Sequence, residues 1–313
     1  MKTAKAARLH SYGGLEAVKI EEMTLPDPKV GEVLVRVQAA GINPIDWKIR
    51  AGYLKEVMPL RMPFTLGVDF AGVIEAIGPG VAGFSVGETV YGEAPVFKGA
   101  SGSFAQALIA KSGNISARPS NLDAVEAAAL PLVGVSAIQA METLGLTTNQ
   151  KLLIHGGGGG IGSIAIRMAK HLGAWVATTV SADDVEYVKS LGADRVINYR
   201  SERFDELLTD LDGVFDTVGG ETYTRSFKVL NRNGQIVSLL ERPREDLMAQ
   251  YKVLASIQFT DVTTRRLAKL TELVHQGIVK SPINRIYTLD ATAAALRHLE
   301  RESPRGKVVL KVA

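Results

Sequence analysis

A run of five glycines, residues 156–160, lies near the middle of this chain of 313 residues. It follows an apolar run at 152–154 and precedes a segment with apolar residues at helical spacing. The run begins a G-x-G-x-x-G pattern whose glycines are Gly157, Gly159 and Gly162. In a strand–turn–helix unit the first glycine permits a tight turn, the second lets a pyrophosphate approach the backbone, and the third lets helix and strand pack closely. Helix amides and the helix dipole favour a phosphate there, so the pattern predicts a dinucleotide site that also includes Gly160 and Ile161.

The residues after the next predicted strand, at 175–180, bear on which dinucleotide is bound. Ser181 follows that strand directly, and no acid stands at its tip. A carboxylate there would accept from the ribose hydroxyls of NAD and repel a 2′-phosphate, whereas a serine would not. We interpret Asp183 and Asp184, just beyond, as first-turn acids of the following helix. Three residues are placed to reach a 2′-phosphate: Lys189, Tyr199 and Arg200. The pattern therefore favours NADPH over NADH.

The composition excludes several other kinds of chemistry. The chain has no cysteine, which excludes disulfides, thiol catalysis and zinc sites built on thiolates. Its net charge is +3, from 36 basic and 33 acidic residues, which is too small to indicate nucleic acid or a membrane surface as a partner. No apolar stretch resembles a secretory signal or is long enough to span a bilayer, so we expect a cytoplasmic protein that acts on a small molecule.

The pattern of predicted strands and helices along the chain indicates two domains. Residues 1–125 hold short strands, at 33–39, 70–77 and 88–92, punctuated by Gly and Pro, which is typical of an antiparallel barrel. In residues 126–260 strands and helices alternate, which predicts a doubly wound parallel sheet. The elements expected there after the glycine run are strands at 175–180, 195–197, 214–218 and 235–239, with helices near 184–191, 202–211 and 223–230. Residues 261–313 break this rhythm, and we expect them to return to the first domain.

Six segments match, in order along the chain, the patterns of a known family. They are Gly41-Ile42-Asn43-Pro44-Ile45-Asp46 as G-x-N-P-x-D, the strand and turn at 66–81, and the segments at 130–140, 192–199, 215–220 and 305–310. In these segments the chain resembles the medium-chain dehydrogenase/reductases, and within them the zinc-independent quinone and enone oxidoreductases. The resemblance implies an α/β protein with a GroES-like antiparallel β-barrel domain and a Rossmann domain with a doubly wound parallel sheet.

One departure separates the branches of that family. Its zinc alcohol dehydrogenases carry cysteine near the position of Asn43, a G-H-E in place of Gly67-Val68-Asp69, and a structural lobe with four cysteines. Here Val68 has no atom that binds a metal, and no cysteine is present, so no zinc is expected. Without a Lewis acid to polarise an alcohol oxygen, the resemblance favours hydride donation to an acceptor that is already electrophilic, such as a quinone or an α,β-unsaturated carbonyl.

The resemblance also places residues at the reacting centre. It implies that Asn43 faces the nicotinamide and donates to a carbonyl oxygen that becomes negative during reduction, the alternative being a turn asparagine before Pro44. Tyr53 would donate a proton or stack on a quinone, and a surface aromatic is the alternative. We interpret Asp46 as a cap or an ion-pair partner, and His155 as a residue that caps its strand and is not a catalytic base.

Further cofactor contacts are expected around the sheet. The resemblance puts Ser136 near the nicotinamide ribose and lets Lys307 close over the cofactor from the returning tail. Backbone contacts are expected at the carboxyl ends of two strands, from Val218, Gly219 and Leu239. The apolar run at 257–259 fits the edge strand through which similar proteins pair, so a homodimer is expected. The alternatives that remain are an enone or alkenal reductase without quinone activity, and a non-catalytic NADPH-binding protein.

Overall fold

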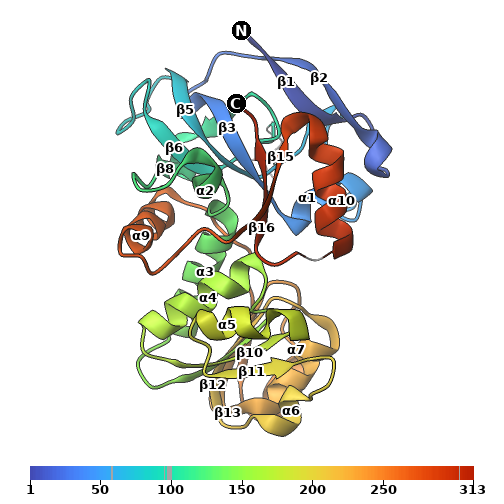
Figure 1. Cartoon of the computed structure of the whole chain (residues 1–313), viewed down its shortest axis with the longest axis vertical. Coiled ribbons are helices and arrows are strands. Elements are labelled where there is room, and N and C mark those ends of the chain that lie inside the picture. The colour runs from blue at the N-terminus through green and yellow to red at the C-terminus, as the bar shows by residue number, and fades with distance from the viewer. Residues whose placement is uncertain (58, 95, 97–100, 303) are drawn as a thin grey trace. The chain divides into compact units, whose positions relative to one another are not determined.

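The structure is a computed structural model that describes residues 1–57, 59–94, 96, 101–302 and 304–313, and it divides into two compact units (Figure 1). Unit 1 comprises Met1–Leu132, Val262–Gln276 and Ser281–Ala313, and unit 2 comprises Val133–Asp261 and Gly277–Lys280. The first division falls after residue 132, beyond the predicted 125, because the helix that enters unit 2 starts only at Pro131. Residues after 261 belong to unit 1 except for 277–280.

Unit 1 is built on two sheets. The strands of the larger sheet are β3 (Glu32–Ile42), β5 (Asp69–Ile77), β6 (Thr89–Glu93), β7 (Ala107–Lys111), β8 (Ile115–Ala117), β15 (Ile283–Thr288) and β16 (Lys307–Lys311). Their order is β15-β16-β3-β5-β6-β8, with β7 beside β3. The smaller sheet has the order β2-β1-β4, from β1 (Lys2–Leu9), β2 (Val18–Leu25) and β4 (Phe64–Thr65). The pair β15–β16 is parallel and the other described pairs of unit 1 are antiparallel.

The returning tail completes the larger sheet of unit 1. Strand β16 pairs antiparallel with β3, with Val308 opposite Ile42, and β3 pairs with β5, with Gly41 opposite Asp69. Three segments far apart in the sequence therefore meet at one end of the sheet. The helices of unit 1 are α1 (Pro44–Ala51), α2 (Ala124–Ala128), α9 (Thr264–His275) and α10 (Thr292–Glu302). Helix α1 starts directly after β3, with Pro44 at its first position, where proline costs no hydrogen bond.

Unit 2 is a six-stranded sheet in which all described pairs are parallel, with the order β11-β10-β9-β12-β13-β14. Its strands are β9 (Lys151–His155), β10 (Trp175–Val180), β11 (Arg195–Asn198), β12 (Leu211–Asp216), β13 (Leu230–Ser238) and β14 (Leu254–Ile257). The strand order reverses between β9 and β12, which is the switch point at which ligands bind in such sheets. The predicted fold class is confirmed.

The helices of unit 2 are α3 (Pro131–Leu144), which begins in unit 1, α4 (Gly160–His171), α5 (Val185–Ser190), α6 (Phe204–Leu207), α7 (Gly220–Ser226) and α8 (Glu245–Tyr251). The predicted helix at 202–211 is too long, because Asp210 adopts a left-handed φ of 55° and Leu211 begins β12. The predicted helix at 223–230 also ends early, since Leu230 begins β13. None of the helices in the described ranges has the length and apolar character needed to cross a membrane.

Candidate active site

The glycine run forms the loop between β9 and α4 in unit 2. The N–H groups of Gly156 and Gly157 both donate to the carbonyl oxygen of Thr179, at 3.1 and 3.2 Å, which holds the loop against the end of β10. Gly156 begins the tight turn and has a positive φ of +75°. The N–H of Gly159 donates to the Gly156 carbonyl oxygen at 3.1 Å, so Gly157 and Gly158 are the central residues of this turn, which agrees with the prediction for Gly157. Gly159 is the N-cap of α4.

Each glycine of the pattern meets a different steric demand. A Cβ on Gly157 would lie 2.2 Å from Oγ1 of Thr178, and one on Gly162 would lie 2.3 Å from the carbonyl oxygen of Gly156. These two glycines are therefore needed for packing within the loop. A Cβ on Gly159 would meet only the Gly156 oxygen, at 3.4 Å, so the space before the helix N-terminus is open. Open space in front of backbone amides is what a pyrophosphate requires, so the loop fits a dinucleotide.

A chain of buried hydrogen bonds links the end of β9, which precedes this loop, to β10 and α7. The hydroxyl of Ser226 donates to the Thr222 carbonyl oxygen at 2.7 Å, so its oxygen accepts from Nε2 of His155 at 2.9 Å. Nδ1 of His155 then accepts from the hydroxyl of Thr179 at 3.0 Å. Burial lowers the pKa of His155 to about 4, which keeps the imidazole neutral at neutral pH. This agrees with the interpretation of His155 as a structural residue.

A buried carboxylate ties together the ends of β12 and β13. Oδ1 of Asp216 accepts from the N–H groups of Val218 and Gly219 at 3.0 and 2.9 Å, and Oδ2 accepts from the hydroxyl of Ser238 at 2.7 Å. The N–H of Leu239 donates to the Asp216 carbonyl oxygen at 3.0 Å. The predicted contacts Val218, Gly219 and Leu239 thus lie together at the carboxyl edge of the sheet. Asp216 and Ser238 were not predicted as site residues, although Asp216 stands in a matched segment.

The ends of β10 and β11 carry groups of both charges. Tyr199 follows β11 and is 57% exposed, and the guanidinium of Arg200 lies 5.8 Å from the centre of its ring. Ser181 follows β10 and is the N-cap of a short 3-10 helix, without a side-chain capping bond. A Cβ on Gly158 would lie 2.5 Å from Oδ2 of Asp184, so this carboxylate lies against the glycine loop. Asp184 occupies the N-cap position of α5, and its side chain makes no capping bond there.

The remaining predicted contact in unit 2 is Ser136, on α3. Its side chain is 1% exposed, and its hydroxyl lies 2.7 Å from Oγ1 of Thr260. The carbonyl oxygen of Ser136 accepts from Nε2 of Gln258 at 3.0 Å. The hydroxyl therefore has a neighbour within unit 2, and its contact with the ribose stays a prediction.

Unit 1 holds a buried cluster of four polar side chains, which we call the lysine cluster: Asn43, Asp46, Asp69 and Lys307. Asn43 is 1% exposed and Lys307 is 3% exposed, and both carboxylates are fully buried. Nζ of Lys307 donates to Oδ1 of Asn43 and lies 3.4 Å from Oδ2 of Asp69. Nδ2 of Asn43 donates to the same Asp69 oxygen at 2.9 Å. Oδ2 of Asp46 accepts from the Asn43 backbone N–H at 2.7 Å, which confirms Asp46 as a cap of α1.

The lysine cluster brings two carboxylates to one ammonium group. Burial raises the pKa of Asp46 to about 7, against the hydrogen bond from the Asn43 N–H and the attraction of Lys307. Burial also raises the pKa of Asp69 and lowers that of Lys307, and each of these shifts is opposed by the charge of the other group. Oδ1 of Asp46 has no hydrogen-bond partner among the described residues. Asp46 therefore holds a proton up to about neutral pH.

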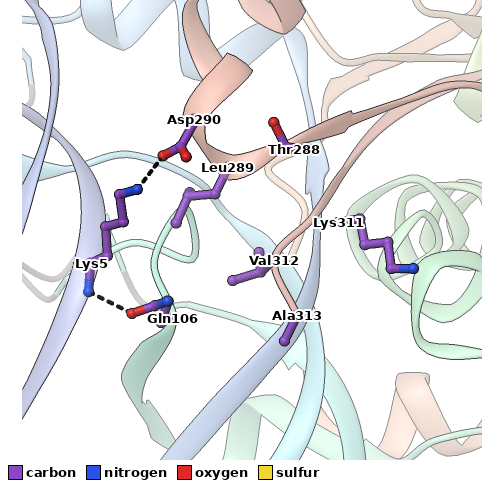
Figure 2. A pocket seen from close by; sticks show the side chains of 8 residues that line it. All are labelled: Lys5, Gln106, Thr288, Leu289, Asp290, Lys311, Val312 and Ala313. Carbon is purple, nitrogen blue, oxygen red and sulfur yellow. Dashed lines mark hydrogen bonds and ion pairs between the residues drawn. The ribbon is translucent and has the colours of Figure 1, made fainter.

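The other predicted residues of unit 1 differ sharply in exposure. Tyr53 lies beyond α1, is 73% exposed, and meets Trp47 edge-on with 5.8 Å between ring centres. Lys307 is enclosed, and its role as a cofactor contact stays a prediction. Unit 1 also has a surface hollow of about 280 Å³ (Figure 2). It contains none of the predicted site residues and is lined by Lys5, Gln106, Thr288, Leu289, Asp290, Lys311, Val312 and Ala313.

Comparisons with known proteins agree with this architecture. Residues 29–120 match the family model of the alcohol dehydrogenase GroES-like domain, and residues 191–310 match that of a zinc-binding dehydrogenase. Within the ranges that the structure describes, no group of three or more His, Cys, Asp or Glu could hold a metal ion. The chain belongs to the medium-chain dehydrogenase/reductase family. Within that family it lies in the quinone oxidoreductase branch.

Two curated relatives and one solved structure illustrate the likeness. A 2-methylene-furan-3-one reductase from Solanum lycopersicum is 34% identical over 98% of this chain and 78% of its own length. An NADPH-dependent alkenal/one oxidoreductase, chloroplastic, from Arabidopsis thaliana is 31% identical over 99% of this chain and 80% of its own length. The structure of the quinone oxidoreductase from Coxiella burnetii has a TM-score of 0.92 and 31% identity, and the likeness covers 100% of both chains.

Proposed function

We propose that this chain is a zinc-independent reductase that transfers hydride from NADPH to a quinone or to the β-carbon of an α,β-unsaturated carbonyl. The observation that carries the proposal is the open space at Gly159, in front of the amides of α4. Relatives that span nearly the whole chain, named as an NADPH-dependent alkenal/one oxidoreductase and as a quinone oxidoreductase, support the substrate class. When bound, NADPH supplies the hydride from C4 of its nicotinamide.

The residues of unit 2 hold and orient the cofactor. Gly159, Gly160, Ile161 and Gly162 present backbone to the pyrophosphate, where the helix dipole favours negative charge. Tyr199 and Arg200 meet the 2′-phosphate, and the loops fixed by Asp216 meet the nicotinamide end. The preference for NADPH is supported by a relative with that cofactor in its name. Asp184, beside the loop, works against it, because a carboxylate repels a phosphate.

Asn43 stabilises the negative charge that develops on the acceptor. One hydrogen of its amide already binds Asp69, and the other, which has no acceptor among the described residues, donates to the carbonyl or quinone oxygen as this oxygen gains charge. A preorganised donor in a buried setting costs no reorganisation during the reaction. The proton that completes the reduction comes from solvent or from the exposed hydroxyl of Tyr53.

Two features support chemistry without zinc. The chain has no cysteine and carries valine at position 68, so two ligand types of the zinc branch are missing. In addition, the ammonium of Lys307 already lies between Asn43 and Asp69, where it would repel a second cation.

We also propose that the chain is a cytoplasmic homodimer. Strand β14 is the last strand of the parallel sheet, and Phe259, just beyond it, is 77% exposed. An apolar side chain next to an open strand edge suits a self-complementary contact. Analytical ultracentrifugation of the wild-type chain and of Phe259→Asp tests the dimer. A dimer that the aspartate converts to a monomer supports it, and a monomeric wild type contradicts it.

The proposed reaction is tested with two acceptors, a simple benzoquinone and a linear enone, each with NADPH and with NADH. Oxidation of the reduced nicotinamide is followed by its absorbance, with and without a chelator. Turnover of either acceptor with NADPH, unaffected by the chelator, supports the proposal. Turnover of the enone alone assigns the chain to the alkenal reductases. Binding of NADPH without turnover of either acceptor, or loss of turnover with chelator, contradicts the proposal.

A further inference from the structure

We propose that Lys307 and Asp69 are positioning residues that hold the Asn43 amide in one orientation and leave a single N–H for the acceptor oxygen. This inference rests on the proposed function, since it concerns the same reaction. It assigns Lys307 to positioning the residue that contacts the substrate, in place of the cofactor contact expected from the sequence.

The orientation of the amide follows from the chemistry of its two neighbours. A lysine ammonium only donates hydrogen bonds, so the atom of Asn43 that faces Lys307 must be the oxygen. An ionised carboxylate only accepts, so the atom that faces Asp69 must be the nitrogen. Reversing the amide would place two donors together on one side and two acceptors on the other. The pair therefore excludes the reversed orientation.

Asp69 is itself held from two sides. Its Oδ1 accepts from the N–H of Leu132 in the first turn of α3, at 2.9 Å, while its Oδ2 binds Asn43. Because both oxygens have fixed donors, the carboxylate cannot rotate to follow a displaced amide. The backbone of β3 beside Asp69 is also closely packed. A Cβ on Gly41, opposite Asp69 in the sheet, would lie 2.3 Å from the Ala128 carbonyl oxygen, so α2 lies directly against the strand there.

Lys307 has no hydrogen left for a cofactor. An ammonium has three N–H bonds, and its nitrogen lies within 2.8 Å of the Ile42 carbonyl oxygen, in hydrogen-bond contact with Oδ1 of Asn43, and 3.4 Å from Oδ2 of Asp69. A phosphate or ribose hydroxyl would have to displace one of these partners. The geometry points instead to an ammonium group whose three hydrogens are all occupied by these partners, one of which is the Asn43 amide that it holds in place.

The first test is Lys307→Met, which keeps an unbranched apolar side chain one atom shorter than lysine and removes the donor. The exposed Lys311→Met on the same strand is the control. We expect the kcat of Lys307→Met to fall at least about tenfold and by no more than the roughly 10²–10³-fold that loss of an oxyanion donor costs, while its Kd for NADPH stays within about twofold of wild type. Lys311→Met should change neither value. A Kd for NADPH that rises as much as kcat falls would overturn the proposal, because it would make Lys307 a cofactor contact.

The second test is the double variant Asp69→Asn/Lys307→Met, which removes one charge of each sign. In it, the new amide at position 69 can accept from Leu132 and donate to Asn43, but only when the Asn43 amide is reversed. We therefore expect the Tm to recover toward wild type while kcat stays as low as in Lys307→Met. Recovery of kcat together with Tm would overturn the proposal, since the pair would then serve charge balance alone.

These two tests are separable from the test of the proposed function. Turnover by the wild-type chain establishes the reaction whatever the variants do, so failure of the positioning pair leaves the reaction standing. If Lys307→Met does not fold, the double variant carries the test by itself, because it buries no unpaired carboxylate at position 69.

Discussion

The glycine loop of unit 2 and the lysine cluster of unit 1 are built in opposite ways. The loop works through backbone amides and through the absence of side chains, most clearly at Gly159. The cluster works through four side chains that are buried together, three of them able to carry charge. A loop of the first kind binds a ligand that brings its own charge. In a cluster of the second kind the charged groups interact with one another. Such a cluster orients a neutral group such as the Asn43 amide and does not bind a charged ligand.

The largest expected effect comes from adding a negative charge to the glycine loop. In Gly159→Asp a carboxylate occupies the place of the pyrophosphate, so we expect NADPH affinity to fall at least about a hundredfold, as for two like charges in close contact. The Tm should barely change, because a Cβ there meets only one atom, at 3.4 Å. Titration of NADPH fluorescence measures the affinity. Gly159→Asn is the neutral control, and equal affinities in the Asp and Asn variants would mean that no phosphate lies there.

A matched substitution separates binding from packing within the same loop. Gly162→Ala places a Cβ 2.3 Å from the Gly156 carbonyl oxygen, so the loop and α4 must move apart. We expect a loss of stability of about 1–3 kcal/mol, as in other overpacked sites. Urea denaturation measures it. A fully stable Gly162→Ala would show that the loop and helix are not held in this contact.

The next effect concerns cofactor choice, where the loop has neighbours of both signs. Arg200→Ala should lower the preference for NADPH over NADH about tenfold, since a hydrogen bond to a charged group contributes about 1.5–3 kcal/mol. Asp184→Asn should change the preference in the opposite direction, because it removes a carboxylate beside Gly158. Values of kcat/KM for both cofactors provide the measure. Lys189→Ala tests the third predicted contact, whose ammonium pairs with Glu186 at 2.8 Å. Shifts of the same sign in Arg200→Ala and Asp184→Asn would contradict this account.

The last prediction is a pH dependence of stability that belongs to the lysine cluster. Burial raises the pKa of Asp46 from 3.8 to about 7, so the folded chain keeps a proton that the unfolded chain releases between these values. Wild type therefore loses stability as pH rises from about 4 to 7, at up to about 1.4 kcal/mol for each pH unit. Asp46→Asn, which mimics the protonated form, lacks this loss. We expect its Tm to exceed that of wild type at about pH 8 by several degrees, and by less at about pH 5. A constant difference would mean that Asp46 is ionised throughout.

The contrast between the two regions also explains which features of the fold and the site could be predicted from the sequence. The parallel sheet, the glycine loop and the return of the tail leave contiguous patterns, and these were predicted. The tight turn that includes Gly157 was predicted, but the positive φ of Gly156 was not, because consecutive glycines do not reveal which of them takes it. Asp69 was missed as a site residue because its partners Asn43, Leu132 and Lys307 are joined to it only by strand pairing and folding.

The central claim, that the Asn43 amide stabilises the reacting acceptor, is tested most directly by single-turnover hydride transfer at saturating NADPH in wild type and Asn43→Ala. The account predicts a rate constant lower by about 10²–10³-fold, as for loss of an oxyanion donor, with a Kd for NADPH within about twofold of wild type. An unchanged rate constant, or a loss that lies entirely in NADPH binding, would contradict it.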